Sequence, residues 1–330
     1  TNVRPGGIER SGLSYEILSK RNPKLVYCAL TGYGLEGPDA NAPGFDVASF
    51  WSRSGLARLT APKGSELFPV RTASGDHTTS IAAVAAMLLA QGETQTLLAM
   101  VLLAGVPAFA FGLAEDITKR VGIWQRLLAT MASGLLGWWM SGYSLTRVDV
   151  PGLDLLLQWL PLSLALTALG VGGVANALNI IDGCHGLAST MASLAFVGLG
   201  LMAAHAGDTP LAAVALTLAA CTWGFFWVNW PLGKIFLGDG GAYFTGFALG
   251  WLSVLLVARN PGVSAFAALM PCIHPVTEVL FSMYRRKVRQ AHPGMPDRLH
   301  FHSLLKRRYV ARWLRHASSD TQNAVTGLLV

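Results

Sequence analysis

The sequence of 330 residues has few charged side chains and few cysteines. Asp, Glu, Lys and Arg make up 13% of it, about half the share of an ordinary soluble protein, whereas hydrophobic residues make up 52%. The four cysteines have no CxxC spacing, which argues against a disulfide framework or a cysteine zinc site. No basic region followed by an apolar core follows Thr1, so no signal peptide is predicted. This composition favours a membrane protein.

The chain has two unlike parts. Residues 1 to about 92 have a soluble composition, with a helix expected near 14–19 and a strand over 24–30. From residue 96 onward, apolar segments approach the length of about 20 residues that a spanning helix needs. The candidate spans are 96–114, 124–143, 154–175, 187–206, 209–228, 243–258 and 262–284. We therefore expect an all-α polytopic membrane protein of about seven transmembrane helices, preceded by a small α/β soluble fragment.

Four polar islands interrupt or border the apolar segments: 115–119, 176–183, 234–241 and 297–302. Alternating spans place the connectors after the first, third, fifth and seventh spans on one side of the membrane, and these connectors hold the islands. They also hold most of the basic residues, so the positive-inside rule makes this side cytoplasmic. The basic cluster over 285–315 follows an apolar span, which favours a flank beside anionic lipid and argues against nucleic acid as a partner.

The islands carry groups suited to binding a metal and a phosphate. Carboxylates fall on three different connectors, at Asp116, Asp182 and Asp239. Mg²⁺ usually binds through one or two carboxylates plus substrate phosphates. Lys119 or Lys234 would add positive charge for a phosphoryl-transfer transition state. Asn176 and Asn179 can both donate and accept hydrogen bonds, as recognition of a nucleotide or sugar requires. The pattern indicates a membrane enzyme for phosphorylated substrates.

Each island also has an interpretation without chemistry. Glu115 and Asp116 could cap a helix or form a surface ion pair, and Asn176 and Asn179 could bond across a helix interface. The segment 238–241 could be a plain turn. The remaining polar groups could be solvated or could pair within the bundle: His300, His302, His274 and Glu278.

In their order and spacing the motifs resemble those of the polyprenyl-phosphate N-acetylhexosamine-1-phosphate transferases, glycosyltransferase family 4, which include phospho-N-acetylmuramoyl-pentapeptide transferase. The resemblance covers about 95–315. The DD motif of the family falls on Glu115-Asp116, NxxNxxDGxxGL on 176–187, GD on Gly238-Asp239, and the histidine loop on 300–302. It implies that a lipid phosphate attacks the β-phosphate of a UDP-amino sugar and releases UMP. The setting implied is the cytoplasmic face of the bacterial inner membrane, in cell-envelope polysaccharide synthesis.

The resemblance also implies a role for each matched residue. The catalytic carboxylates would be Glu115, Asp116, Asp182 and Asp239. Among these, Asp239 and Asp182 would hold Mg²⁺, for which Mn²⁺ is a substitute. The substrate contacts would be Asn176, Asn179, Lys119, Lys234, His185, His300 and His302. The partners implied are a UDP-amino sugar, a polyprenyl phosphate and the lipid bilayer, and a homodimer is open because members of the family can dimerise.

Three positions depart from the pattern of the family. Glu115 replaces the first aspartate of the DD motif, which keeps the charge and lengthens the reach. His185 stands where many members have Asp or Asn, and Ser303 where some have a third histidine. The identity of the sugar therefore does not follow from the motifs.

The first part of the sequence resembles a middle section of family III CoA-transferases, on residues 2–6, 22–28, 31–38 and 75–79. In that family the aspartate that matches Asp76 forms a covalent acyl anhydride, a nucleophilic role open to a carboxylate. We expect residues 1–92 to be a CoA-transferase-like fragment without activity, and residues 93–330 to be a membrane domain truncated at both ends. The alternatives are an acyl-CoA transferase that uses Asp76, and an inactive membrane remnant of a gene fusion.

Overall fold

The computed structural model describes residues 12, 14–23, 38, 92–231, 236–288 and 299–330. The chain divides into two compact units, Thr1–Gln91 and Gly92–Val330. In the first unit, helix α2 (Tyr15–Arg21) agrees with the helix expected near 14–19. The expected strand over 24–30, Asp76 and Lys234 all lie outside the described residues.

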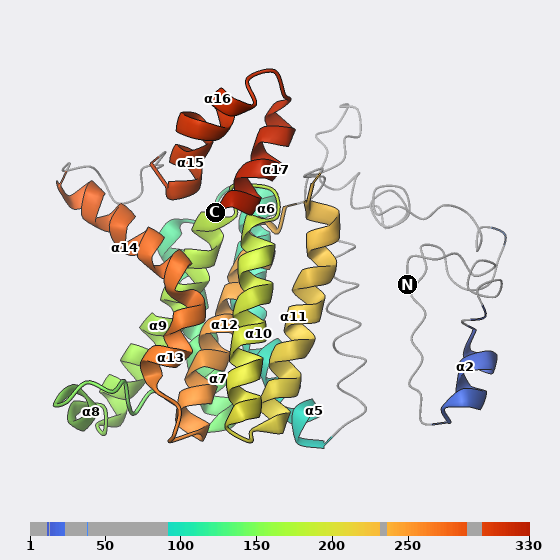
Figure 1. The fold of residues 1–330 in the computed structure, drawn as a ribbon. Helices are drawn as coiled ribbons and strands as arrows, with labels where there is room; N and C mark the ends of the chain where they lie inside the picture. The colour runs from blue at the N-terminus through green and yellow to red at the C-terminus, as the bar shows by residue number, and fades with distance from the viewer. Residues whose placement is uncertain (1–11, 13, 24–37, 39–91, 232–235, 289–298) are drawn as a thin grey trace. The chain divides into compact units, whose positions relative to one another are not determined.

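The second unit is a bundle of long helices (Figure 1). Its elements in chain order are α5 (Gly92–Ala104), α6 (Val106–Thr118), α7 (Ile123–Ser141), α8 (Leu153–Leu156), α9 (Leu160–Ile181), α10 (Leu187–His205), α11 (Thr209–Asn229), α12 (Gly238–Arg259), α13 (Ala265–Leu269), the 3₁₀ turn η2 (Met270–Cys272) and α14 (Ile273–Val288). A final group comprises α15 (Phe301–Leu305), the π-helical turn η3 (Lys306–Val310), α16 (Ala311–Trp313) and α17 (Ser319–Leu329). Helices are thus the regular elements of the described chain, which confirms the expected fold class.

Six helical segments of the described chain are long and apolar enough to cross a membrane: Gly92–Thr118, Leu160–Ile181, Leu187–His205, Thr209–Trp227, Gly238–Arg259 and Ala265–Val288. The remaining expected span, 124–143, corresponds to α7, which has 19 residues and packs against α6 and α9. Gln125 and Arg126 lower the hydropathy of α7 near its start. The chain is therefore a multi-pass helical membrane protein.

Helix α12 lies at the centre of the bundle, with 83% of its apolar window buried. Small residues let its backbone approach its neighbours. A β-carbon at Gly246 would lie 2.6 Å from Ala175 Cα of α9, and one at Gly112 of α6 would lie 2.6 Å from the backbone carbonyl of Asp239. Close approach at small residues is the usual basis of helix packing in lipid. As a result, the ends of α6 and α9 are fixed beside the start of α12.

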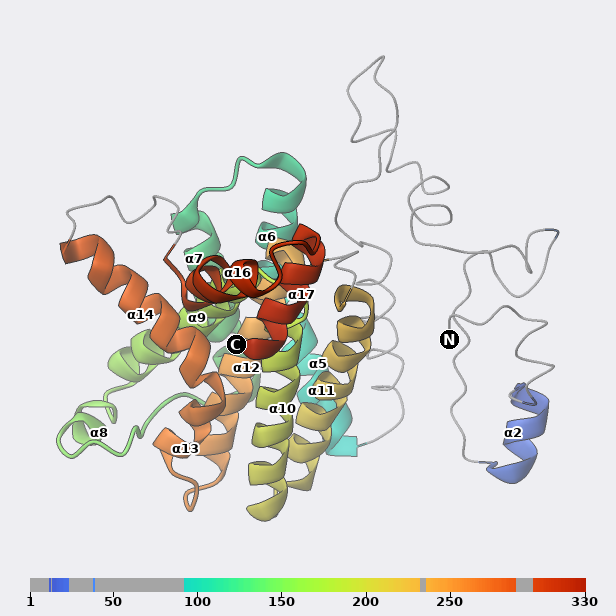
Figure 2. The same ribbon diagram turned by 45° about the horizontal axis from the view of Figure 1, so that its top comes forward.

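The helix ends that carry the polar islands lie at one end of the bundle, which we call the site end (Figure 1). Helices α15 to α17 lie across this end (Figure 2). Helix α17 is packed tightly there, because a β-carbon at Gly327 would lie 2.0 Å from the carbonyl oxygen of His185. Trp230 Nε1 also donates to the carbonyl oxygen of Ala324 at 3.2 Å.

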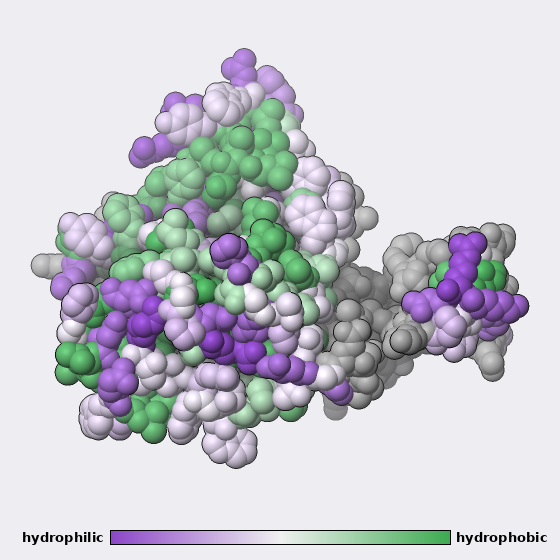
Figure 3. All heavy atoms as spheres, turned by 60° about the horizontal axis from the view of Figure 1, so that its bottom comes forward, coloured by the Kyte–Doolittle hydropathy of each residue, from purple (hydrophilic) through white to green (hydrophobic). Residues whose placement is uncertain are grey.

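The opposite end of the bundle carries paired charges, and Figure 3 turns this end forward and shows hydrophilic residues gathered across it. Arg259 Nε lies 2.7 Å from Asp208 Oδ2, and Arg259 Nη2 lies 2.9 Å from Glu93 Oε1. Arg147 Nη1 lies 2.5 Å from Asp149 Oδ1. The two pairs of Arg259 link the first turn of α5, the turn before α11 and the end of α12.

The helix boundaries differ from the expected connectors at two islands. Asn176 and Asn179 lie in the last turns of α9, and Asp239 lies in the first turn of α12. The apolar residues between and after the two asparagines continue the helix. An aspartate in a first turn is favoured by the helix dipole.

Candidate active site

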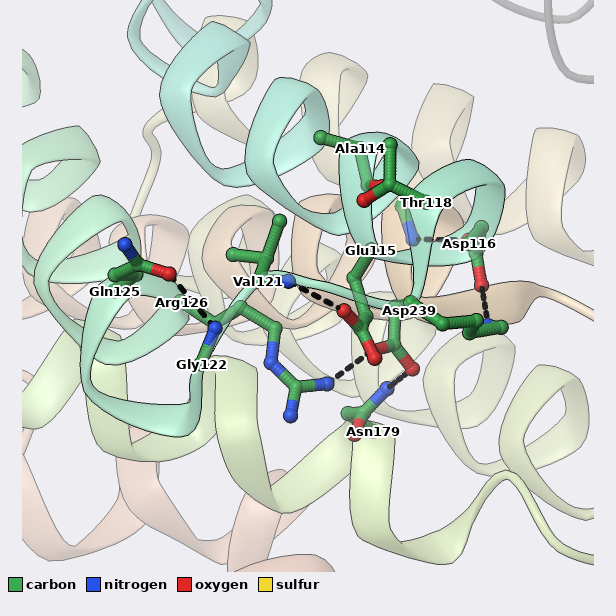
Figure 4. A network of polar contacts seen from close by, with 12 residues as sticks. Ala114, Glu115, Asp116, Thr118, Val121, Gly122, Gln125, Arg126, Asn179 and Asp239 are labelled. Atoms are coloured by element: carbon green, nitrogen blue, oxygen red, sulfur yellow. Dashed lines mark hydrogen bonds and ion pairs between the residues drawn. The ribbon is translucent and has the colours of Figure 1, made fainter.

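Asp239 is the point at which three helices meet (Figure 4). Its carboxylate is in the first turn of α12, and Asn179 Nδ2 of α9 donates to Oδ1 at 2.9 Å. Arg126 of α7 forms an ion pair with Oδ2 from the other side. Both the arginine and the aspartate side chains are mostly buried, with 16% and 22% of their surface exposed. A charge-assisted pair of this kind fixes the carboxylate in one orientation.

Asp116 connects the end of α6 to the same turn of α12. Its Oδ2 accepts a hydrogen bond from the backbone N–H of Gly240 at 3.0 Å. Gly238 has a φ of 64°, and a β-carbon there would lie 2.7 Å from Asp116 Oδ2, so this turn requires glycine. Lys119 Nζ lies 3.6 Å from Asp116 Oδ1, although the lysine side chain is 68% exposed. Asp116 therefore forms the ion pair that the sequence left open, and it also bonds to a second helix.

Glu115 has a more local contact. Its Oε2 accepts from the backbone N–H of Val121 at 2.8 Å, which ties the end of α6 to the turn before α7 (Figure 4). This bond holds a turn between two helices, and it is neither the helix cap nor the surface ion pair that the sequence left open for Glu115.

Asp182 follows the last residue of α9 and lies beside the turn that begins α12. Burial raises the pKa of Asp182 to about 7, and the negative charges of Asp239 and Asp116 act in the same direction. Hydrogen bonds from the backbone of Gly238 and Leu237 oppose this rise. Three carboxylates from separate islands thus influence one another electrostatically at the site end.

The histidine loop, which lies later in the chain, contacts the turn that holds Asp182 and Gly183. His302 is buried, and a β-carbon at Gly183 would lie 2.8 Å from His302 Nε2. The rings of His300 and His302 are stacked, with centroids 5.6 Å apart. Burial, helped by His300 and His274, lowers the pKa of His302 to about 4, while Glu278 opposes this shift. His302 is therefore neutral at neutral pH.

Two of the expected substrate contacts make bonds elsewhere. Asn176 Nδ2 donates to Thr130 Oγ1 of α7 at 3.3 Å and to the carbonyl oxygen of Gly172 at 2.8 Å. It therefore bonds across a helix interface, which was the structural alternative. His185 is buried, and its Nδ1 lies 3.2 Å from the carbonyl oxygen of Pro231.

Arg126 is a site residue that the motifs did not identify. It lies in the first turn of α7 and stands apart from the four polar islands, so no motif contained it. Its Nε is buried and meets no acceptor among the described residues. The available signal was an arginine inside an expected span, because an ionisable side chain in a span suggests a functional site.

Residues 98–257 match the family model of glycosyl transferase family 4, and residues 1–96 match that of CoA-transferase family III. A probable undecaprenyl-phosphate N-acetylglucosaminyl 1-phosphate transferase of Bacillus subtilis (strain 168) is 32% identical over 143 residues, 42% of this chain and 39% of the relative. Undecaprenyl-phosphate alpha-N-acetylglucosaminyl 1-phosphate transferase of Salmonella typhi is 32% identical over 152 residues, 44% of this chain and 41% of the relative.

The N-terminal part matches a different protein. Cinnamoyl-CoA:phenyllactate CoA-transferase of Clostridium sporogenes is 38% identical over 96 residues, which are 29% of this chain and 23% of the relative. The chain thus spans about two fifths of the sugar-phosphate transferases that it matches, and about a quarter of this CoA-transferase. Residues 98–257 are thus similar to a part of glycosyl transferase family 4, and residues 1–96 are similar to a part of CoA-transferase family III.

Proposed function

We propose that residues 93–330 form a membrane domain that transfers an N-acetylhexosamine-1-phosphate from a UDP-amino sugar to a polyprenyl phosphate and releases UMP. The observation that carries this proposal is the meeting of Asn179 and Arg126 on Asp239, beside Asp116 and Asp182, at one end of the bundle. Groups from separate helices that converge at a membrane surface suit a substrate with a charged head and an apolar tail. The names of the matched relatives support the same chemistry.

The site has groups for both halves of a diphosphate. Arg126 is paired with Asp239 through one terminal nitrogen, while its buried Nε has no acceptor among the described side chains and backbone. An arginine presents several donors in a fixed plane, so a phosphate oxygen could satisfy the remaining ones. Lys119 adds an exposed positive charge beside Asp116. His302, on which the ring of His300 is stacked, lies against Gly183 in the turn after α9.

The carboxylates fit a divalent cation whose coordination shell the substrate phosphates would complete. Among the described residues no three His, Cys, Asp or Glu side chains form a ready-made metal site. Mg²⁺ does not need one, because it usually takes one or two carboxylates and fills its shell with water and phosphate oxygens. Asp239 and Asp182 supply oxygen ligands of this kind, and the negative charge that acts on Asp182 is what a cation would relieve. Bound there, Mg²⁺ or Mn²⁺ would neutralise the diphosphate and favour attack at phosphorus.

The protein orients the two substrates and forms no covalent intermediate with them. An oxygen of the polyprenyl phosphate attacks the β-phosphorus, the bond from that phosphorus to the bridging oxygen breaks, and UMP leaves with that oxygen. Arg126 stabilises the charge that develops on the phosphoryl oxygens. Asp116 Oδ1, which lies 3.6 Å from Lys119 Nζ and is not the oxygen that accepts from Gly240, takes the proton of an acceptor phosphate that arrives protonated.

The setting follows from the distribution of charge. The site end carries the basic cluster that follows the last span, which supports a cytoplasmic orientation by the positive-inside rule. We place the domain in a bacterial inner membrane. Residues 1–96 match about a quarter of the CoA-transferase, and this proposal assigns no activity to them. The product would enter cell-envelope polysaccharide synthesis.

The test is magnesium-dependent release of UMP by membranes that contain the protein, with a UDP-amino sugar and a polyprenyl phosphate as substrates. Asp239→Asn should lower the rate by roughly 100-fold or more, because it removes a charge at the reacting centre. Asp320→Asn, the same change at an exposed site on α17, should leave the rate unchanged. Loss of acyl transfer in Asp76→Ala, with no UMP release by the wild type, would instead support the CoA-transferase alternative.

A further inference from the structure

Glu278 occupies a position where a carboxylate needs partners. It lies in α14, within the membrane-span candidate Ala265–Val288, and its side chain is only 12% exposed. The neighbouring apolar side chains Leu280 and Phe281 are exposed, as expected of a surface that faces lipid. Carboxylates within membrane spans are rare and usually paired, because it is costly to remove their charge from water. The partners of Glu278 therefore indicate its role.

Both oxygens of Glu278 contact the histidine loop. Oε1 accepts from the backbone N–H of Phe301 at 3.1 Å, and Oε2 lies 3.2 Å from His300 Nδ1. His300 precedes the first residue of α15, and its own side chain makes no capping bond. Glu278 thus caps α15 from another helix, a favourable place for a negative charge.

The contact with His300 also determines how the imidazole is presented. A carboxylate at Nδ1 fixes a proton on that nitrogen and leaves Nε2 for another ligand. The ring of His300 is stacked on that of His302 with an angle of 8° between their planes. His302 in turn packs against Gly183, which is next to Asp182. A continuous row of contacts therefore runs from Glu278 to the carboxylates of the site.

We propose that Glu278 is a positioning residue, which holds the N-terminus of α15 and the Nδ1 side of His300 so that the histidine loop faces the phosphates of the substrate. This inference rests on the proposed function, since it assigns a partner to the histidines of that site. Glu278 acts through His300 and does not itself touch the substrate. Its two contacts can be separated by mutation.

Glutamine keeps an oxygen that accepts from Phe301 N–H but loses the charge that holds His300, whereas alanine loses both. Glu278→Gln should lower kcat for UMP release by about 10-fold, the scale seen when a carboxylate that orients a histidine is removed. Hydrogen exchange of backbone amides over 299–305 should stay at the wild-type rate in Glu278→Gln and become faster in Glu278→Ala. Glu93→Gln, the same change at a 58% exposed glutamate at the other end of the bundle, should alter neither measurement.

A double mutant tests whether Glu278 acts through His300. In a His300→Ala background, Glu278→Gln should cause less than about a 2-fold further loss, because residues that act as a unit are not additive. A Glu278→Gln enzyme with the wild-type kcat would reduce the residue to a structural cap and overturn the proposal. A loss that adds fully to that of His300→Ala would overturn it too.

The exchange measurement does not depend on activity. If the wild type released no UMP, the proposed function would fail, yet faster exchange over 299–305 in Glu278→Ala would still support Glu278 as the anchor of the loop. Unchanged exchange in Glu278→Ala would overturn the anchor, whatever the activity of the wild type.

Discussion

Gly183 is the position at which a single added methyl group should separate activity from folding. A β-carbon there would lie 2.8 Å from His302 Nε2, and ordinary contact begins at 3.4 Å, so the ring must retreat by about 0.6 Å. Gly183 is not one of the described glycines with a positive φ, so alanine adds little backbone strain there. A displacement approaching 1 Å in a reacting group can lower a rate by about 100-fold. We expect Gly183→Ala to lower UMP release by roughly 10- to 100-fold.

The matched control is Gly173→Ala in α9, where an added β-carbon would meet nothing within 4 Å. Alanine in a helix interior is favoured over glycine by about 1 kcal/mol, so this variant should be at least as stable as the wild type and equally active. Both variants are purified in detergent and compared by UMP release and by thermal unfolding. If Gly183→Ala unfolds like the wild type and retains at least half of the rate of Gly173→Ala, the packing of His302 on this turn does not matter for the reaction, and the reasoning is refuted.

Two further predictions concern stability. Burial acts to raise the pKa of Asp208, but the hydrogen bonds from Arg259, Leu211 and Asn260 outweigh it, so the pKa lies below its usual value. The folded state is therefore stabilised above the pKa that Asp208 has in the unfolded chain, and this stabilisation is lost as the pH falls through the pKa of the folded state. Asp208→Asn should lower the free energy of unfolding by roughly 1.5–3 kcal/mol at pH 7, measured by thermal unfolding in detergent. An unchanged unfolding midpoint would contradict this prediction. The pKa of His302 is lowered to about 4, so the unfolded chain takes up a proton near pH 6.5 and the folded chain does not. Stability should fall by up to about 3 kcal/mol between pH 6.5 and 4, and His302→Gln should lose this part of the pH dependence in the same assay.

The fold of the membrane domain was largely predictable because each span is an apolar segment of nearly uniform character. Its boundaries were less so. The span expected at 154–175 is the helix Leu160–Ile181, because Gly152 and Pro161 interrupt the start and the asparagines do not end the helix. The end of the segment is set by Asp182 and Gly183, which leave the helical path. Apolar composition thus locates a helix in lipid, while turn residues decide where it stops.

The candidate site was predictable where a motif gathers several polar residues and was missed where a single residue acts. Asp116, Asp182, Asp239 and Asn179 come together, and each stands in a polar island. Arg126 is a lone cation near the start of α7, and its partner is 113 residues away in the chain. A lone polar residue gives no pattern, so its role is visible only once the packing of α7 against α9 and α6 places it.

The two ends of the bundle differ in how completely their charges are paired. At the end opposite the site, Asp208 and Arg259 bind each other, and Asp149 accepts from Ser264 Oγ at 2.8 Å and from the backbone N–H of Ala265 at 2.7 Å. At the site end, Asp182 is left beside two other carboxylates and Arg126 keeps a buried donor unused among the described residues. A carboxylate beside like charges and a buried donor without an acceptor both destabilise a fold, so they are expected where a ligand completes the pairing. In the proposed function, a divalent cation would offset the negative charge around Asp182, and a phosphate of the substrate would accept from Arg126 Nε.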